Sequence, residues 1–476
     1  MEPLADRFLE QLRAGSADPG LLALAGDEDP ARSASVFEAA ARHPDLAPDL
    51  ERWVPELLVG ARPGHGARLL LELAEQVRAD AARLDSGGLR SLSRILAGSN
   101  FLGRGLRRRP EWIRELAGPL PGPPEDQEPE DWEDLRDAKY RGLLRVAARD
   151  FGGRPFQEGL AELSALADRC LLTALRCASA EVGVPPPALF ALGKLGGREL
   201  NLSSDVDLLF LYEASGPEQD VARNREVAQV ARRLKQGLEV PTAEGFGYRV
   251  DLDLRPEGRT GALANSVAAA LDYYEAFGAE WERQMLIRLR FVAGDAAAGQ
   301  AFSQAILPFV YRRSVDPGAL EHVRAMKTRI EEERRAQRLD LEHHLKEGPG
   351  GIRDVEFLLQ ALQLFYGGVH PELRSGNVLE GLEALGRLGI LSEETALALA
   401  GAYQWLRRAE HGLQLEEERQ LHTVPREPAA QRALARRMGY REPEAEQARE
   451  RMLDDWTAVR AEVRGHFEEL LLGGER

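Results

Sequence analysis

The chain has 476 residues, of which 43% are hydrophobic and 29% charged, and its net charge is −16. This composition is typical of a folded protein of about two to four domains, and the excess of acidic side chains argues against broad non-specific binding to nucleic acid. No uncharged apolar run approaches the roughly 20 residues that span a bilayer, and the first residues lack the pattern of a signal peptide. We therefore expect a cytoplasmic protein that contacts neither membrane nor nucleic acid.

The first third of the chain has the pattern of helices. Residues 1–117 place apolar side chains at helical spacing, with Pro or Gly every ten to twenty residues, and predict a region of short amphipathic helices. Residues 118–131 are rich in proline and acids and predict an exposed linker. A long helical pattern then runs from 132 to about 182. It carries both cysteines, Cys170 and Cys177, which we expect to be reduced thiols.

Strand patterns appear only in the middle of the chain. Short apolar or alternating runs predict strands at 187–192, 206–212 and 246–255, with a helix at 220–238 between the last two. Residues 285–292 fit either a strand or a helix. From 297 onward the pattern is helical again, most clearly at 353–366. The predicted fold is α+β and mostly helical, with a small mixed-sheet domain at 132–300 and a C-terminal helical domain at 301–476.

The most informative feature is a pair of aspartates at the start of the second predicted strand. Asp205 and Asp207 are two residues apart, so on a strand their side chains lie on one face, about 7 Å apart. Two carboxylates on a buried strand repel each other and are costly to desolvate, and a divalent cation relieves both effects. Asp251, on the third predicted strand, is a candidate third ligand. Three carboxylates suffice to bridge two Mg²⁺ ions.

The residues around the aspartates indicate which reaction the metal would assist. A diglycine, Gly196 and Gly197, lies just upstream and leaves backbone N–H groups free to approach an anion, with Ser204 between the two motifs. Arg255 and Arg259 follow the third strand and are candidates for charge-assisted bonds to phosphate. A lone Asp-x-Asp is often only a turn former. The combination nevertheless favours phosphoryl or nucleotidyl transfer.

Other motifs are more ambiguous. The glycine-rich segment 348–351 looks like a phosphate loop but lacks a following Lys-Ser or Lys-Thr, so a sharp turn between helices is the better interpretation. Lys346 and Arg353 flank it at a distance that still allows contact with a nucleotide. His343 and His344 are adjacent and fit surface positions better than a shared metal site.

Several segments together resemble one known family. The segment GKLGG at 193–197 and the run 204–208 resemble the signature of the glutamine synthetase adenylyltransferase family, also called the glutamate–ammonia-ligase adenylyltransferases. Further matches follow in order at 250–258, 273–283, 309–313, 348–357 and 406–411, and the strong matches cover about residues 90–425. The resemblance implies a DNA polymerase β-like nucleotidyltransferase fold flanked by helical domains.

The resemblance also implies an activity. Family members attach AMP to a tyrosine of glutamine synthetase with ATP, or remove it by phosphorolysis to give ADP, under control of a PII signalling protein and glutamine. Asp205, Asp207 and Asp251 would hold Mg²⁺, and Gly196 and Gly197 would lie near the phosphates. The expected partners are thus glutamine synthetase and a PII protein.

Two departures from the family pattern stand out. Asp253 replaces the arginine that the family usually carries at this position, which adds negative charge near the metals. Full-length members hold two catalytic halves, whereas this chain holds one, and its tail from 407 to 425 looks more like the AMP-removing half. Two alternatives stay open: a nucleotidyltransferase acting on another acceptor, and a non-catalytic regulatory docking module.

Overall fold

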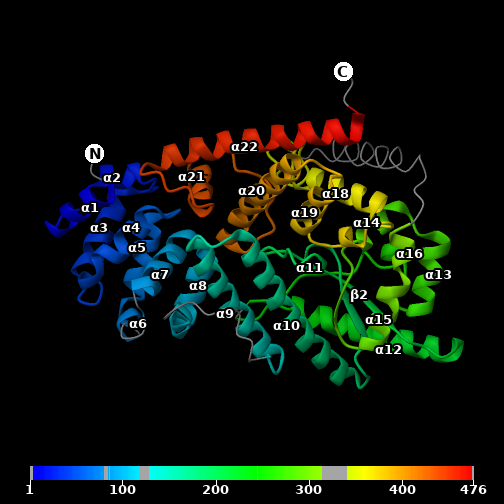
Figure 1. Cartoon of the computed structure of the whole chain (residues 1–476). Coiled ribbons are helices and arrows are strands. Elements are labelled where there is room, and N and C mark those ends of the chain that lie inside the picture. The colour runs from blue at the N-terminus through cyan, green and yellow to red at the C-terminus, as the bar shows by residue number, and fades with distance from the viewer. Residues whose placement is uncertain are drawn as a thin grey trace.

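The computed structural model describes residues 4–79, 84, 86–116, 128–243, 245–312 and 340–473. In chain order it contains an N-terminal helical region, a small mixed sheet with its covering helices, and a C-terminal helical region (Figure 1). The predicted α+β, mostly helical fold is confirmed. Within the described ranges, none of the helices is both long and apolar enough to cross a membrane.

The N-terminal region is built from short helices, as predicted. Several begin with a side-chain cap or a proline in the first turn: Asp18 caps α2 before Pro19, Asp29 caps α3 before Pro30, and Ser99 caps α8. The helices are α1 (Leu4–Arg13), α2 (Pro19–Leu24), α3 (Pro30–Arg42), α4 (Leu50–Leu58), α5 (Pro63–Glu72), α6 (Ala74–Ala79), α7 (Ser86–Gly98) and α8 (Asn100–Arg108), followed by the 3₁₀-helix η2 (Pro110–Leu116). Most of the predicted linker, 118–127, lies outside the described residues.

The single long helix predicted from 132 to about 182 is wrong, because the chain forms two helices there. α9 (Trp132–Phe151) ends at two glycines, and α10 (Phe156–Val182) begins after Pro155. Gly153 adopts φ +87°, a left-handed conformation that favours glycine and ends the helical path. Cys170 and Cys177 both lie on α10 as free thiols, as predicted.

The sheet is small and mixed. β1 (Ala188–Ala191) pairs antiparallel with β2 (Val206–Tyr212) and with β5 (Arg290–Ala293). β2 also pairs in parallel with β3 (Val250–Asp251) at its beginning and with β4 (Ala264–Ser266) at its end. Apart from Asp207, the residues of β1 and β2 are apolar and buried, which is why their sequence signal is continuous rather than alternating.

Around the sheet, the open choice at 285–292 is resolved as a helix followed by a strand. α14 (Glu280–Leu286) precedes β5, and α12 (Pro217–Glu239) is the helix predicted between the second and third strands. The other elements here are α11 (Gly193–Gly196), α13 (Val267–Phe277), α15 (Ala296–Ala305) and α16 (Leu307–Val310).

The third predicted strand, 246–255, is wrong in extent, because only Val250 and Asp251 form β3. Directly after it the Asp251 carboxylate accepts a hydrogen bond from the backbone N–H of Asp253 (2.7 Å) and closes a turn. The Arg255 guanidinium then binds the carbonyls of Leu252 (2.7 Å) and Gly261 (3.1 Å) and holds the turn in place. These local bonds replace the strand pairing.

The C-terminal region is helical and has its own apolar core, separate from the core that joins the N-terminal helices, α9, α10 and one face of the sheet. A third cluster covers the other face of the sheet. The helices are α18 (Ile352–Tyr366), α19 (Val378–Arg387), α20 (Glu393–Glu417), α21 (Pro428–Arg437) and α22 (Ala445–Phe467). In Figure 1, α22 runs along one edge of the molecule, from α21 beside the N-terminal helices to α18.

Candidate active site

Two of the predicted metal ligands, Asp207 and Asp251, lie side by side on neighbouring strands of the sheet. Asp207 on β2 is the register partner of Asp251 on β3, so their Cα atoms lie about one strand spacing, roughly 4.8 Å, apart. Burial, together with the negative charge of Asp251, raises the pKa of Asp207 to about 6. Part of the repulsion is offset by the ammonium groups of Lys346 and Lys194. The pair is thus an electrostatically unfavourable acidic site that a cation would stabilise.

Asp205 is close to this pair but is engaged elsewhere. Its carboxylate accepts a hydrogen bond from Nε of Arg249 (2.6 Å), and the same guanidinium binds the hydroxyl of Ser203 (3.1 Å). Asp205 still contributes to the raised pKa of Asp207, which places its charge near the pair. Within the described chain, however, Asp205, Asp207 and Asp251 do not bring three ligand atoms within 4.8 Å of one another. A cation shared by all three would require at least one of these carboxylates to move.

The glycine that lies against the carboxylates is Gly193, which the sequence analysis did not single out. It begins the one-turn helix α11 with φ +54°, and a Cβ at this position would lie 2.1 Å from Oδ2 of Asp207. Only glycine combines this backbone conformation with so close an approach. The sequence did carry a signal for Gly193. It directly follows the apolar run of β1, which is where a turn at the end of a strand is expected.

The residues predicted to contact phosphate, Gly196, Gly197, Ser204 and Arg255, each have packing or hydrogen-bonding contacts within the protein. A Cβ on Gly196 would lie 1.8 Å from the carbonyl of Arg288, and one on Gly197 would lie 2.6 Å from the carbonyl of Gly376, so both glycines permit close backbone packing. The Ser204 hydroxyl accepts a bond from the N–H of Asn201 (3.2 Å) and shapes the turn before β2. As described above, Arg255 is buried and holds the turn that follows β3.

Asp253, which replaces the usual arginine of the family pattern, is neutralised locally. Its carboxylate pairs with Nε of Arg259 (2.6 Å) and lies 3.8 Å from Arg255. The hydrogen bond with Asp253 raises the pKa of Arg259. Both predicted arginines therefore act on their own loop, and the charge introduced by Asp253 is compensated at the rim of the site.

A buried ionic cluster connects α11 and the loop between α11 and β2 to the C-terminal region. Glu410 on α20 is fully buried and accepts hydrogen bonds from Lys194 (2.8 Å), Asn201 (2.5 Å) and His422 (2.7 Å), with Arg407 at 3.3 Å. Burial alone would raise the pKa of Glu410, but these cations hold it well below its usual value. Burial in turn lowers the pKa of Lys194 to about 8.

Arg407 and Gln414 on α20 extend the same contact. The Arg407 guanidinium binds the backbone carbonyl of Glu199 and Oδ1 of Asn201 (3.1 Å), and the Gln414 amide oxygen accepts from the N–H of Ser203 (3.0 Å). The loop between α11 and β2, which ends at Asp205, is thus positioned by one face of α20. Sequence spacing alone cannot reveal this contact, because the partners are about 200 residues apart.

The glycine-rich segment 348–351 is a turn at the start of α18, in agreement with the sequence interpretation. Gly350 has φ +73° and packs against the carbonyl of Arg460. Lys346, just before the turn, lies close enough to Asp207 to lower that group's pKa, whereas Arg353 pairs with Glu347 (2.7 Å). Of the two flanking cations, Lys346 is therefore the one that acts on the carboxylate site.

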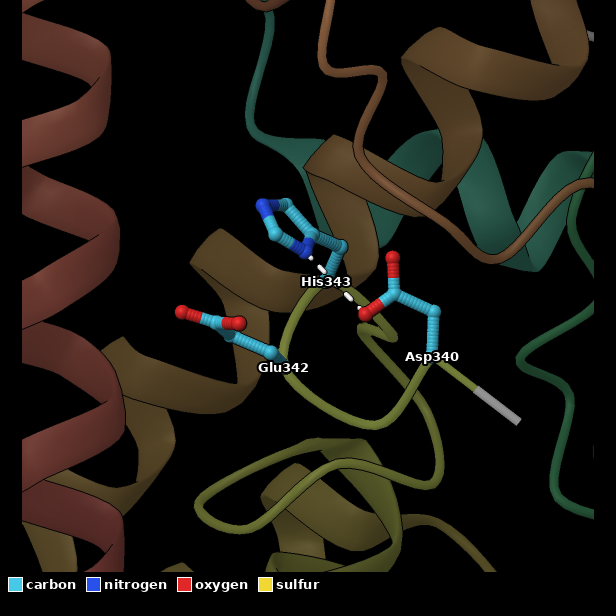
Figure 2. Close-up of side chains that lie close together, drawn as sticks. All are labelled: Asp340, Glu342 and His343. Atoms are coloured by element: carbon cyan, nitrogen blue, oxygen red, sulfur yellow. Dashed lines mark hydrogen bonds and ion pairs between the residues drawn. The ribbon is translucent and has the colours of Figure 1, made fainter. Parts of the chain in front are cut away.

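The two adjacent histidines lie at partly exposed surface positions, as the sequence interpretation favoured. His344 is half-buried and stacks on His422, with 5.7 Å between the ring centroids. His343, Asp340 and Glu342 place their ligand atoms within 4.8 Å of one another, and Figure 2 shows these three side chains around one loop. Arg426 already neutralises Asp340 (2.8 Å), so this group is an ion-paired surface cluster.

The small mixed sheet, the carboxylates on its adjacent strands β2 and β3, and the left-handed glycine beside them define a nucleotidyltransferase-like α+β protein. Residues 89–305 match the model of the family described as glutamate-ammonia ligase adenylyltransferase. Residues 324–471 match the model described as GlnD PII-uridylyltransferase. The family resemblance inferred from the motifs is confirmed.

Known relatives cover most of this chain. A bifunctional glutamine synthetase adenylyltransferase/adenylyl-removing enzyme of Stenotrophomonas maltophilia strain K279a is 38% identical over 418 residues, which is 83% of this chain and 42% of the relative. A protein of the same name from Nitrosococcus oceani is 40% identical over 354 residues, 71% of this chain and 36% of the relative. The chain thus spans less than half the length of the curated relatives it matches.

Proposed function

We propose that this chain is a Mg²⁺-dependent nucleotidyltransferase that moves AMP to or from a tyrosine of glutamine synthetase. The observation that carries the proposal is the pairing of Asp207 with Asp251 beside Gly193, within a segment of the adenylyltransferase family. The names of the relatives, which cite both adenylylation and its removal, support the substrate. The match of residues 324–471 to a PII-uridylyltransferase model supports a PII protein as a regulator.

The residues present fit a divalent cation. Carboxylate oxygens are the ligands that Mg²⁺ prefers, and the raised pKa of Asp207 marks a buried negative charge without sufficient compensation. In this proposal Asp207 and Asp251 hold the metal, joined by Asp205 once its carboxylate leaves Arg249. Bound Mg²⁺ supplies charge neutralisation at the phosphates and lowers the pKa of an attacking hydroxyl.

The chain's own side chains then contribute position and charge. Gly193 leaves room for the Asp207 carboxylate to lie against the backbone of α11, and the ammonium of Lys346 approaches the same site from the helical region. In adenylylation, the tyrosine oxygen forms a bond to the α-phosphorus of ATP and pyrophosphate leaves. In removal, a phosphate oxygen bonds to the phosphorus of the AMP group, the bond to the tyrosine oxygen breaks, and the tyrosine recovers its proton while ADP forms. The resemblance of the tail at 407–425 to the AMP-removing half favours removal.

The test is direct. The purified chain is incubated with unmodified glutamine synthetase and ATP, and separately with adenylylated glutamine synthetase and phosphate, each with Mg²⁺, and the modification is followed by mass spectrometry. We expect AMP transfer in at least one arm, and its loss in D205N and D207N variants that retain their fold. A wild-type chain that is inactive in both arms, or variants with near-normal turnover, would refute the proposal.

A further inference from the structure

A polar cavity lies away from the carboxylate site, where the N-terminal helices meet α20. Its volume is about 310 Å³, and it is enclosed by the end of α7, the turn between α9 and α10, one side of α20 and the segment after α21. Five arginines line it, against a single carboxylate, that of Asp150. The proposed AMP transfer assigns no role to this cavity, although Arg408 and His411 lie in the matched segment 406–411.

The charges around the cavity are only partly compensated. Three of its arginines have carboxylate partners: Arg94 pairs with Glu56, Arg154 with Asp150, and Arg437 with Glu416. The other two, Arg408 and Arg441, form no ion pair in the described part of the chain. Arg408 lies over the ring of Phe156 (5.7 Å), and Arg441 donates to the carbonyl of Phe151 (3.3 Å). Arg408 and Arg441 are both exposed residues, so an anion can reach their guanidinium groups from solvent.

A buried imidazole supplies an independent sign of an absent partner. His411 lines the cavity and is only 5% exposed, yet neither of its ring nitrogens forms a hydrogen bond in the described structure. Nε2 lies within ion-pair distance of Oδ2 of Asp150 (3.4 Å), so Nδ1 is the ring nitrogen that is left without a partner in the described residues. A buried polar group without a partner is rare, and an unbound ligand is one of its ordinary causes.

We propose that this cavity binds a small anion carrying phosphate or carboxylate groups, held by Arg408, Arg441 and His411. Guanidinium groups form paired, charge-assisted bonds to both classes of anion. The volume fits a ligand of few atoms, which agrees with a metabolite-sized anion rather than a polymer.

The position of the cavity links it to the catalytic loop through a single helix. Arg408, His411 and Leu415 line the cavity, and Arg407, Glu410 and Gln414, one position earlier in each turn, bind the loop that ends at Asp205. An anion that orders the cavity face of α20 therefore also acts on the face that positions the catalytic loop. This consequence for turnover rests on the proposed function, whereas anion binding itself does not.

Isothermal titration calorimetry separates the two anion classes. Inorganic phosphate and succinate are each titrated, with EDTA present, into the full chain carrying D207N, so that the carboxylate site recruits no phosphate through a metal. The same titrations are run with R408Q or R441Q added. The matched control is R387Q, on an exposed residue of α19 that pairs only weakly with Glu383 (3.9 Å).

We expect at least one anion to bind, with affinity at least tenfold lower in R408Q and R441Q and unchanged in R387Q. Binding of phosphate alone, or of succinate alone, assigns the ligand class. The proposal is overturned if neither anion binds, or if R408Q and R441Q bind as tightly as R387Q. In chains with intact carboxylates, the bound anion should alter AMP transfer in wild type and not in R408Q. If the anion binds but the chain with intact carboxylates transfers no AMP, the proposed function fails and the anion site stands.

Discussion

At the scale of single residues, the site is defined by charge that the fold leaves uncompensated. Asp207 is ionised at neutral pH although it is buried and paired in register with a second carboxylate. The protein therefore gives up stability to keep this negative charge in place, and such a cost is typical of residues retained for function rather than for folding.

Replacing Asp207 with asparagine should stabilise the metal-free protein. A pKa raised from 3.8 to about 6 means that ionised Asp207 disfavours the folded state, so D207N should gain about 1–3 kcal/mol above pH 6. The sign follows from the raised pKa: the difference is full above about pH 6, shrinks as the pH falls, and vanishes below pH 4, where both states of the wild type are protonated. Urea unfolding at pH 7.5 and pH 4 measures it. A D207N variant less stable than wild type at pH 7.5 would contradict the assignment.

Gly193 makes a second prediction at this scale. A G193A variant places a Cβ 2.1 Å from Oδ2 of Asp207 in a left-handed conformation, so we expect AMP transfer to fall at least a hundredfold. The control is G183A, because Gly183 also has a positive φ (+80°) but has nothing within 4 Å of its Cβ position. Both variants should lose about 1 kcal/mol from backbone strain. Equal activity in the two variants would show that contact with Asp207 is irrelevant.

At the scale of elements, α20 is the helix on which both sites depend. One of its faces binds α11 and the loop between α11 and β2 through Arg407, Glu410 and Gln414, and the neighbouring face lines the arginine-rich cavity. The loop before β2 has little regular structure of its own, so its shape depends on this helix. A helix in the C-terminal region thereby sets the position of an aspartate in the sheet region.

A charge-removing change in α20 tests this dependence. E410Q leaves Lys194 and Arg407 buried without their anion, and breaking one member of a buried ionic cluster costs about 3–5 kcal/mol. We therefore expect E410Q to lower both the free energy of unfolding and AMP transfer. E417Q on the same helix is the control, since the Glu417–Arg104 pair is more exposed and is worth at most about 1 kcal/mol. Urea denaturation and the AMP-transfer assay compare the two. Similar stability losses would argue against a special role for Glu410.

The sequence predicted the central strands well and their surroundings less well. β1 and the part of β2 after Asp207 are continuous apolar runs, a pattern that specifies buried strands. The short β3 was not foreseen, because the turn after Asp251 depends on hydrogen bonds that alternation of residue types does not encode. Glu410 carried a signal that was overlooked: it is an acid next to Ala409 on the apolar side of α20, which indicates a buried cationic partner.

At the scale of the whole molecule, the N-terminal helices are part of the structure that supports the sheet. Their apolar core is continuous with α9, α10 and one sheet face, whereas the C-terminal helices have a core of their own. Specific contacts also link the N-terminal helices to α9. The Trp112 indole stacks on Tyr140 (6.5 Å between ring centroids) and donates to Asp137 (3.1 Å). Arg94 donates to the carbonyl of Phe151 (3.0 Å). The anion cavity lies at this same junction.

Because the apolar core is continuous, removing the N-terminal helices should destabilise the sheet region. A chain that begins at residue 128 exposes buried side chains of α9 such as Leu143, Leu144 and Phe151. Each loses about 1.5–3 kcal/mol of burial, a total comparable with the whole stability of a domain. We expect the 128–476 fragment to show no cooperative thermal transition for the sheet region by circular dichroism. Because the lost contacts are non-covalent, co-expression with residues 1–127 should restore the transition. A fragment that melts alone within about 5 °C of the full chain would show that the sheet region folds without the N-terminal helices.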